Sequence, residues 1–137
     1  MIKPMKLGVK TMVEQARREI TEYAAADAIT LAQDRNVLLV DIRDPRELAR
    51  DGKVPGALHA PRGMLEFWID PDSPYFKPVF GEDRKFVFFC AGGLRSALTT
   101  KTLQDMGLSP VAHIEGGFSA WKAAGGPVEA VPPKHDK

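Results

Sequence analysis

The chain has 137 residues, which is enough for one domain with a substantial apolar core. Lys and Arg number 19 against 18 Asp and Glu, so the net charge of +1 gives no reason to expect a nucleic-acid or membrane partner. The N-terminus lacks the apolar stretch of a secretory signal, and the single cysteine cannot form an intrachain disulfide. We therefore expect a cytoplasmic protein.

Helical patterns occupy the first third of the chain. Apolar residues recur at helical spacing from Val9 to Ile20, and we interpret residues 1–18 as a helical extension. A weaker helix is predicted over residues 24–32, with Thr21 as its candidate N-cap. The main domain is expected over residues 19–130, and residues 131–137 are expected to be disordered.

The first predicted strand leads directly into a capped helix. Residues 36–41 (NVLLVD) form a continuous apolar run of strand length, typical of a strand covered on both faces. Asp44, Pro45 and Glu47 then have the spacing of a capping box, and Gly52 is expected to end this helix. Residues 53–59 predict a turn and a short edge strand.

The region from residue 62 to residue 84 has a different character. A short amphipathic turn over residues 64–69 precedes a proline-rich stretch that reads as a long surface loop. The segment is a candidate lid, and its aromatic residues are a candidate docking surface for a partner protein: Phe67, Trp68, Tyr75 and Phe76. The alternative is that these side chains simply close over the core.

Two further strands and two helices complete the pattern. Strands are predicted over residues 85–89 and 111–114, each followed by a helix, the first of them beginning near Ser96 and ending at Gly107. Alternating strands and helices predict a three-layer α/β fold, with a central, mainly parallel sheet of about five strands and helices on both faces.

The chemically informative segment is residues 90–96 (CAGGLRS). Cys90 follows a strand, at the edge of the sheet where ligands of open α/β folds bind. Gly92 and Gly93 allow the backbone to curl and direct N–H groups inward, while the following helix and Arg95 add positive charge. A thiol held there should ionise readily, so Cys90 is predicted to be a nucleophile in an anion-binding loop.

The alternative to this prediction is an inert, structural role for Cys90. A lone cysteine after an apolar strand is more often a buried core residue, and glycine pairs or arginines near helix starts are each weak signals. Their combination at this spacing is much more selective, and it favours the catalytic interpretation.

Several segments together resemble the single-domain rhodaneses, which are sulfurtransferases. The matching segments run in the same order as in that family over about residues 20–128: 40–43 (VDIR) with Glu47, 52–59 (GKVPGALH), 89–96 (FCAGGLRS), 116–121 (GGFSAW) and 126–127 (GP). A further similarity to prokaryotic members covers residues 61–67.

The resemblance implies sulfur transfer in two steps through a persulfide on Cys90. It implies that Arg95 supports the loop and its charge, and that Asp41 and Arg43 brace the loop from the preceding strand. Backbone N–H groups of the loop would bind the transferred sulfur, from Ala91, Gly92, Gly93, Leu94 and Ser96. No metal or organic cofactor is implied.

One position departs from the family pattern. Members that prefer thiosulfate often have basic side chains just after the cysteine, whereas Ala91 and Gly92 stand here. The expected donor is therefore either a small sulfur-containing anion such as thiosulfate or a persulfide. The acceptor would be cyanide or a thiol, and a sulfur-relay protein is an alternative partner.

Other functions remain as alternatives. A cysteine-dependent phosphatase on a related fold places Arg six residues after Cys, whereas Arg95 is five after Cys90, which gives a smaller loop. Arsenate reduction has no particular support, and a module that docks a partner to relay sulfur stays open. His59, His113 and His135 show no metal-binding spacing, and His59 is expected to be structural.

Overall fold

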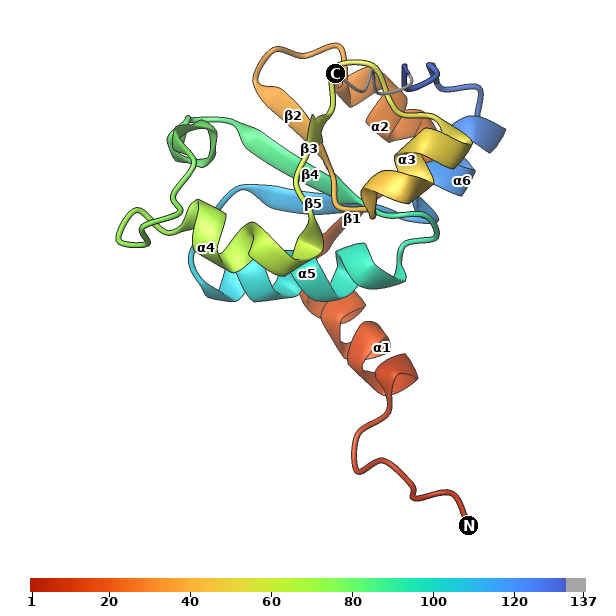
Figure 1. Ribbon diagram of the computed structural model, residues 1–137, viewed down its shortest axis with the longest axis vertical. Coiled ribbons are helices and arrows are strands. Elements are labelled where there is room, and N and C mark those ends of the chain that lie inside the picture. Colours follow the sequence, from red (N-terminus) through yellow and green to blue (C-terminus); the bar gives the residue numbers. More distant parts are fainter. Residues whose placement is uncertain (133–137) are drawn as a thin grey trace, which may run out of the picture.

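The computed structural model describes residues 1–132 and contains one five-stranded sheet with helices on both sides (Figure 1). The strands lie in the order β1-β5-β4-β2-β3, and each pairing within the described residues is parallel. Their bounds are Thr21–Tyr23 (β1), Val37–Asp41 (β2), Leu58–His59 (β3), Lys85–Phe89 (β4) and Val111–Ile114 (β5). The three-layer α/β prediction is confirmed.

Helices connect the strands and form the outer layers. The α-helices are Val9–Glu19 (α1), Ala25–Leu31 (α2), Pro45–Asp51 (α3), Leu65–Ile69 (α4), Leu94–Asp105 (α5) and Gly117–Ala123 (α6). Two short 3₁₀ turns lie at Arg62–Met64 and Pro78–Gly81. Helices α4 and α5 lie on one face of the sheet and α2, α3 and α6 on the other, while α1 packs against the outer side of α5 (Figure 1).

Alternation along the central strands builds a separate core on each face of the sheet. In β4, Phe86 and Phe88 pack toward α4 and α5, while Val87 and Phe89 pack against the layer that contains Trp121. All five residues of β2 are buried, as expected for a strand covered on both sides. Burial of these side chains fixes the register, since a slip of one residue would exchange the two faces.

The capped helix after β2 forms as predicted. The Asp44 side chain accepts a hydrogen bond from the Arg46 N–H, and the Glu47 carboxylate accepts one from the Asp44 N–H, so the capping box is complete. Pro45 is the first helical residue and Gly52, with a φ of 91°, is the C-cap. This start holds Glu47 at the carboxyl end of β2.

The structure differs from the sequence-based prediction at Thr21, and part of the predicted disordered tail falls outside the described residues. Thr21 does not cap α2, whose N-cap is Ala24 without a side-chain hydrogen bond. Thr21 instead begins β1, a three-residue edge strand whose length gives no recognisable periodicity. Of the predicted disordered tail, residues 133–137 lie outside the described residues.

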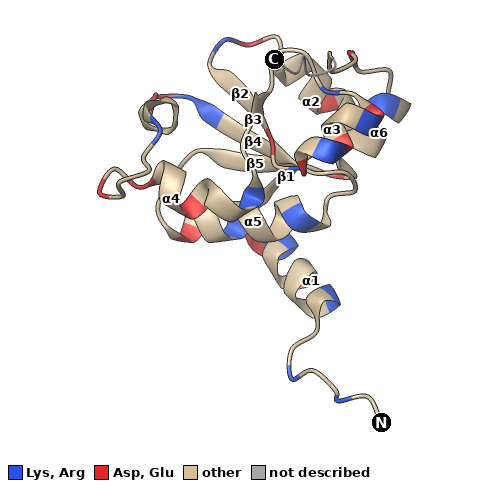
Figure 2. Ribbon diagram, in the orientation of Figure 1, with Lys and Arg blue, Asp and Glu red and all other residues tan. Residues whose placement is uncertain are grey.

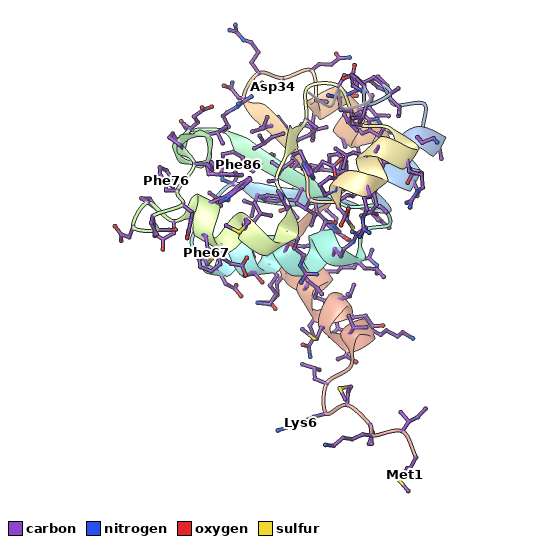
Figure 3. All side chains as sticks on the ribbon, viewed as in Figure 1. Met1, Lys6, Asp34, Phe67, Phe76 and Phe86 are labelled. Atoms are coloured by element: carbon purple, nitrogen blue, oxygen red, sulfur yellow. The ribbon has the colours of Figure 1, made fainter. Side chains whose placement is uncertain are left out.

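The proline-rich segment extends from α4 to β4 along one side of the molecule. Phe76 lies in this segment and Phe67 lies in α4 before it, while Phe86 lies on the sheet (Figure 3). Met1 and Lys6 lie on the N-terminal segment that leads away from the domain (Figure 3). Phe67 and Tyr75 are exposed and form an edge-to-face pair with ring centres 6.3 Å apart. Trp68 instead packs against the core, so the four aromatic residues do not form one continuous patch.

Charged residues of both signs are distributed over the surface (Figure 2). Among residues 1–132, no helix combines the length and the apolar character needed to cross a membrane. In the same part of the chain, no group of three or more His, Cys, Asp and Glu residues has the arrangement of a metal site.

Candidate active site

The site lies at the edge where the parallel strands β2, β4 and β5 end. Cys90 follows β4 directly and is 1% exposed, in a turn that leads into α5. Asp41 ends the neighbouring β2, and residues 115–117 follow β5 on the other side. The topology therefore brings three segments, far apart in sequence, around one thiol.

Backbone N–H groups surround the sulfur of Cys90. The Gly93 N–H donates to Cys90 Sγ at 3.1 Å, and the Ser96 N–H donates to it at 3.4 Å. Gly93 is the N-cap of α5, so these donors belong to the positive end of a twelve-residue helix. Such donors stabilise negative charge on sulfur, because they are already oriented when the charge develops.

Glycine is required at two positions around this loop. Gly93 has a φ of 98°, a left-handed conformation that residues with a side chain adopt at a cost, and a Cβ there would lie 3.1 Å from Gly116 N. Gly117 has a φ of 59°, and a Cβ on it would collide with the Cys90 carbonyl oxygen. The start of α6 can therefore approach the loop closely.

That close approach is secured by two backbone hydrogen bonds. The Phe118 N–H donates to the Cys90 carbonyl at 2.8 Å, and the Ser119 N–H donates to the Ala91 carbonyl at 3.0 Å. The first turn of α6 thus holds the start of the cysteine loop in place. Gly93 and Gly117, which belong to two different glycine pairs of the sequence, allow this backbone contact.

Arg95 is tied to helix α3 by a two-pronged ion pair. Its Nη1 and Nη2 donate to the two Glu47 carboxylate oxygens, both at 2.9 Å. These bonds lower the pKa of Glu47 to about 2, although partial burial opposes the change. The pKa of Arg95 is raised, chiefly by its hydrogen bonds to Glu47 and also by the charge of the nearby Cys90.

Asp41 and Arg43 form a second ion pair, which is fully buried. Arg43 Nη2 donates to Asp41 Oδ2 at 2.8 Å and to the Gly52 carbonyl at 2.9 Å. The Arg43 guanidinium also lies 4.0 Å from the ring centre of Phe118. The pair thus connects the end of β2 with the end of α3 and with α6, and Arg43 lines the same hollow as Ala91, the residue after Cys90.

The other residues of the loop are placed differently. Leu94 begins α5 and is 63% exposed, and Gly92 is exposed, with open space where a Cβ would lie. Ala91 borders a surface hollow beside α6, whose other lining residues include Ser119 and Lys122. His59 Nε2 donates to the Arg43 carbonyl at 2.7 Å, which places His59 beside the ion pair.

A hydrogen-bonded chain that was not expected from the sequence extends from the other side of Cys90. Cys90 Sγ lies 3.6 Å from Ser96 Oγ, and that hydroxyl lies 2.9 Å from His113 Nδ1. His113 Nε2 in turn lies 2.6 Å from Glu22 Oε2. Residues 22 and 113 are neighbours in the β1–β5 register, which sequence spacing alone could not reveal.

The fold and the site define an α/β domain with a nearly enclosed cysteine, whose sulfur accepts hydrogen bonds from loop amides at the carboxyl end of a parallel sheet. The chain matches the family described as rhodanese-like domain over residues 24–124. The protein belongs to the rhodanese-like domain family.

Similar proteins support this assignment. A sulfurtransferase from Allochromatium vinosum is 35% identical over 73% of this chain and 85% of its own. A putative sulfurtransferase from Bacillus subtilis, YtwF, is 31% identical over 77% of this chain and 90% of its own. A solved structure from Rhodopseudomonas palustris, described as a protein of unknown function and possible tyrosine phosphatase, is 61% identical. It has a TM-score of 0.91 and covers 94% of this chain and 99% of its own.

Proposed function

We propose that this protein is a sulfurtransferase that carries sulfur as a persulfide on Cys90. The observation that supports this most directly is the pair of N–H donors, from Gly93 and Ser96, on the Cys90 sulfur. They favour the thiolate, and a second sulfur bonded to it would lie about 2 Å further on, still within a loop built to hold an anion.

The transfer takes place in two displacements. The Cys90 thiolate attacks the outer sulfur of the donor, the new S–S bond forms, and the bond from that sulfur to the rest of the donor breaks. The leaving group, sulfite from thiosulfate or a thiolate from a persulfide, departs with the electron pair. The acceptor, cyanide or a thiolate, then attacks the outer sulfur and regenerates the Cys90 thiolate, so no external oxidant or reductant is needed.

Charge around the loop favours a persulfide over thiosulfate as the donor. Both arginines on this side of the site are already neutralised, Arg95 by Glu47 and Arg43 by Asp41. Gly92 adds no cation, so a dianion meets little net positive charge from these pairs. A thiol persulfide carries less charge than thiosulfate, so it loses less hydration free energy when it enters the site.

The decisive experiment is intact-protein mass spectrometry. The purified chain is incubated with thiosulfate or with cysteine persulfide, then with cyanide, beside a Cys90→Ser variant. We expect the mass of one sulfur atom to appear on the wild type, to be lost with cyanide as thiocyanate forms, and to be absent from the variant. Sulfur transfer by Cys90→Ser, or no sulfur uptake from any donor, would overturn the proposal.

Phosphatase activity is a separate arm of the same experiment. The spacing of five residues from Cys90 to Arg95 gives a loop smaller than a phosphoryl group requires, and Glu47 occupies both terminal nitrogens of Arg95. We expect no turnover of an aryl phosphate under conditions in which persulfide forms. Phosphate release that depends on Cys90, without sulfur uptake, would favour the phosphatase alternative.

A further inference from the structure

The side of Cys90 that faces β5 has polar contacts that sulfur binding by the loop does not explain. Ser96 and His113 are 0% and 1% exposed, so both lie within the apolar interior next to the thiol. Burial of a hydroxyl and an imidazole is unfavourable unless both find partners. Here Ser96 contacts the Cys90 sulfur and His113, and His113 in turn contacts Glu22.

The donors and acceptors along the chain have one consistent direction. The Cys90 thiol points to Ser96 Oγ at 3.6 Å, and the Ser96 hydroxyl can donate to His113 Nδ1 at 2.9 Å. The Nε2–H of that tautomer then donates to Glu22 Oε2 at 2.6 Å. A neutral imidazole with Nδ1 unprotonated satisfies these three contacts. The Gly93 carbonyl, 3.4 Å from Ser96 Oγ, is a more distant acceptor for the same hydroxyl proton.

The outer end of the chain is anchored and reaches the surface. Arg17, on α1, donates to both Glu22 carboxylate oxygens at 2.8 and 3.1 Å, and its Nη2 lies 3.4 Å from Glu115. The Glu22 side chain is 21% exposed and that of Arg17 is 45% exposed. Glu22 and Arg17 border a small surface hollow, together with His113 and Gly93. Protons can therefore exchange with water at Glu22 although Cys90 is enclosed.

We propose that His113 takes up the Cys90 proton through Ser96, with Glu22 and Arg17 holding the imidazole in the tautomer that can accept it. The proton on Sγ passes to Ser96 Oγ as the Ser96 proton passes to His113 Nδ1. The S–H electron pair stays on sulfur, and Ser96 ends with one proton as before. The result is a thiolate and an imidazolium beside a carboxylate. This inference builds on the proposed nucleophilic role of Cys90.

The protonation states that surround His113 fit this role. Burial lowers the pKa of His113, and the Glu22 carboxylate opposes this only in part, so the ring rests in its neutral, accepting form. Burial would raise the pKa of Glu22, but the hydrogen bonds from Arg17 and His113 outweigh it and lower that pKa. Arg17 and Glu115 are the other charged groups that act on the ring, and they act in opposite directions.

Neither His113 nor Glu22 contacts the sulfur, so both are positioning residues, and the test must separate this role from a structural one. The rate of Cys90 alkylation by iodoacetamide is measured against pH in the full chain, where Cys90 is the single cysteine. In His113→Asn, the side-chain amide can still accept from Ser96 but cannot take up a proton. We expect the midpoint of the profile to rise by about one pH unit, which is about tenfold slower alkylation below the midpoint.

Three variants make the result interpretable. Ser96→Ala interrupts the chain but keeps the Ser96 N–H donor, and it should raise the midpoint as His113→Asn does. Glu22→Gln should give a smaller shift in the same direction. His59→Asn is the matched control, because His59 contacts the Arg43 carbonyl outside the chain, and its profile should equal that of the wild type.

A structural role alone would lower the unfolding midpoint in urea and leave the alkylation profile in place. The proposal is overturned if folded Ser96→Ala and His113→Asn keep the wild-type profile, or if Ser96→Ala does so when His113→Asn fails to fold. Alkylation needs no sulfur donor. A shifted profile without sulfur uptake would thus refute the sulfurtransferase proposal alone, whereas sulfur uptake with unshifted profiles would refute the relay alone.

Discussion

The two sides of the Cys90 loop are built on different principles. The side toward β2 and α3, here the ion-pair side, consists of two ion pairs, Asp41–Arg43 and Glu47–Arg95. The side toward β5 and β1, here the relay side, consists of Ser96, His113, Glu22 and Arg17 and contains an imidazole that can change its charge. The ion pairs hold the geometry of the Cys90 loop, whereas the hydrogen-bonded chain through His113 can accept and release a proton.

This difference has a consequence for experiments. Substitutions of Asp41, Arg43 and Glu47 should act mainly through stability and turnover, whereas loss of Arg95 also removes a cation beside Cys90 and should shift its alkylation profile. Substitutions on the relay side should alter the pH dependence of Cys90 alkylation. On the ion-pair side and in the loop itself, the expected effects range from a large loss of stability to a small change with pH.

The largest effect is expected from Arg43→Met. The substitution leaves the Asp41 carboxylate, which is 2% exposed, buried without its counter-ion and removes the bond to the Gly52 carbonyl. Breaking a buried ion pair in this way costs about 3–5 kcal/mol in the free energy of unfolding. Urea denaturation followed by circular dichroism measures the change.

The matched control for that measurement is Arg46→Met, three residues further along the chain. Arg46 pairs with Asp44, but its side chain is 90% exposed, so its loss should change the stability far less than loss of Arg43. Equal effects of the two substitutions would show that burial of the Asp41–Arg43 pair does not determine its importance.

Arg95→Ala should affect turnover more than folding. It removes the cation beside Cys90 and releases Glu47, which becomes a negative charge near a thiolate. We expect kcat/KM for sulfur transfer to fall about 10- to 100-fold, or about 1.4–2.7 kcal/mol. Steady-state kinetics with a persulfide donor provides the measurement.

Arg95→Lys distinguishes charge from geometry at the same position. Lysine keeps the positive charge but cannot bind both Glu47 oxygens with a planar fork, so an intermediate rate is expected. Wild-type kcat/KM in Arg95→Ala would remove Arg95 from the catalytic site.

The contrast between the two sides also explains what the sequence could reveal. The capping box at Asp44 and Glu47 and the cysteine loop lie in short continuous motifs that local rules could find, whereas Asp41 and Arg43 were recognised through the family resemblance. The relay joins Glu22, Ser96 and His113 across three elements. Its only local signal was a histidine in an apolar strand, which has no partner in sequence.

The missing piece was β1. This strand has three residues, and its pairing with β5 places Glu22 beside His113. A segment so short shows no alternation, and Thr21 has the sequence position of a helix cap. The register that creates the relay comes from the pairing of β1 with β5, which lies far along the chain and is therefore a long-range effect.

A smaller effect is expected when a cation is added to the loop. Gly92 does not have a positive φ, and a Cβ on it would meet no heavy atom within 4 Å, so Gly92→Lys should fold normally. The new charge should raise kcat/KM for thiosulfate by up to about tenfold at low salt, with little change for a persulfide donor. Gly92→Gln is the neutral control. The same gain from glutamine would mean that charge is not what limits thiosulfate use.

The smallest effect separates the two sides by pH. Because the pKa of Glu47 is lowered from 4.5 to about 2 in the folded protein, its contribution to stability is complete above about pH 4.5 and is lost as the pH falls toward 2. Glu47→Gln keeps an acceptor for the Asp44 N–H and removes only the charge, so at pH 7 it should cost about 1 kcal/mol or less.

Urea denaturation of the wild type and Glu47→Gln across this range tests the prediction, because the other carboxylates titrate alike in both proteins and cancel in the difference. The two stabilities should converge as the pH approaches 2. A difference that stays constant from pH 7 to pH 2.5 would mean that Glu47 acts through its shape and not its charge. The Glu47–Arg95 pair would then add no acid dependence to the free energy of unfolding. With convergence, Glu47 keeps its charge until the pH is acidic, so titration of Glu47 does not cause a change in Cys90 alkylation near neutral pH.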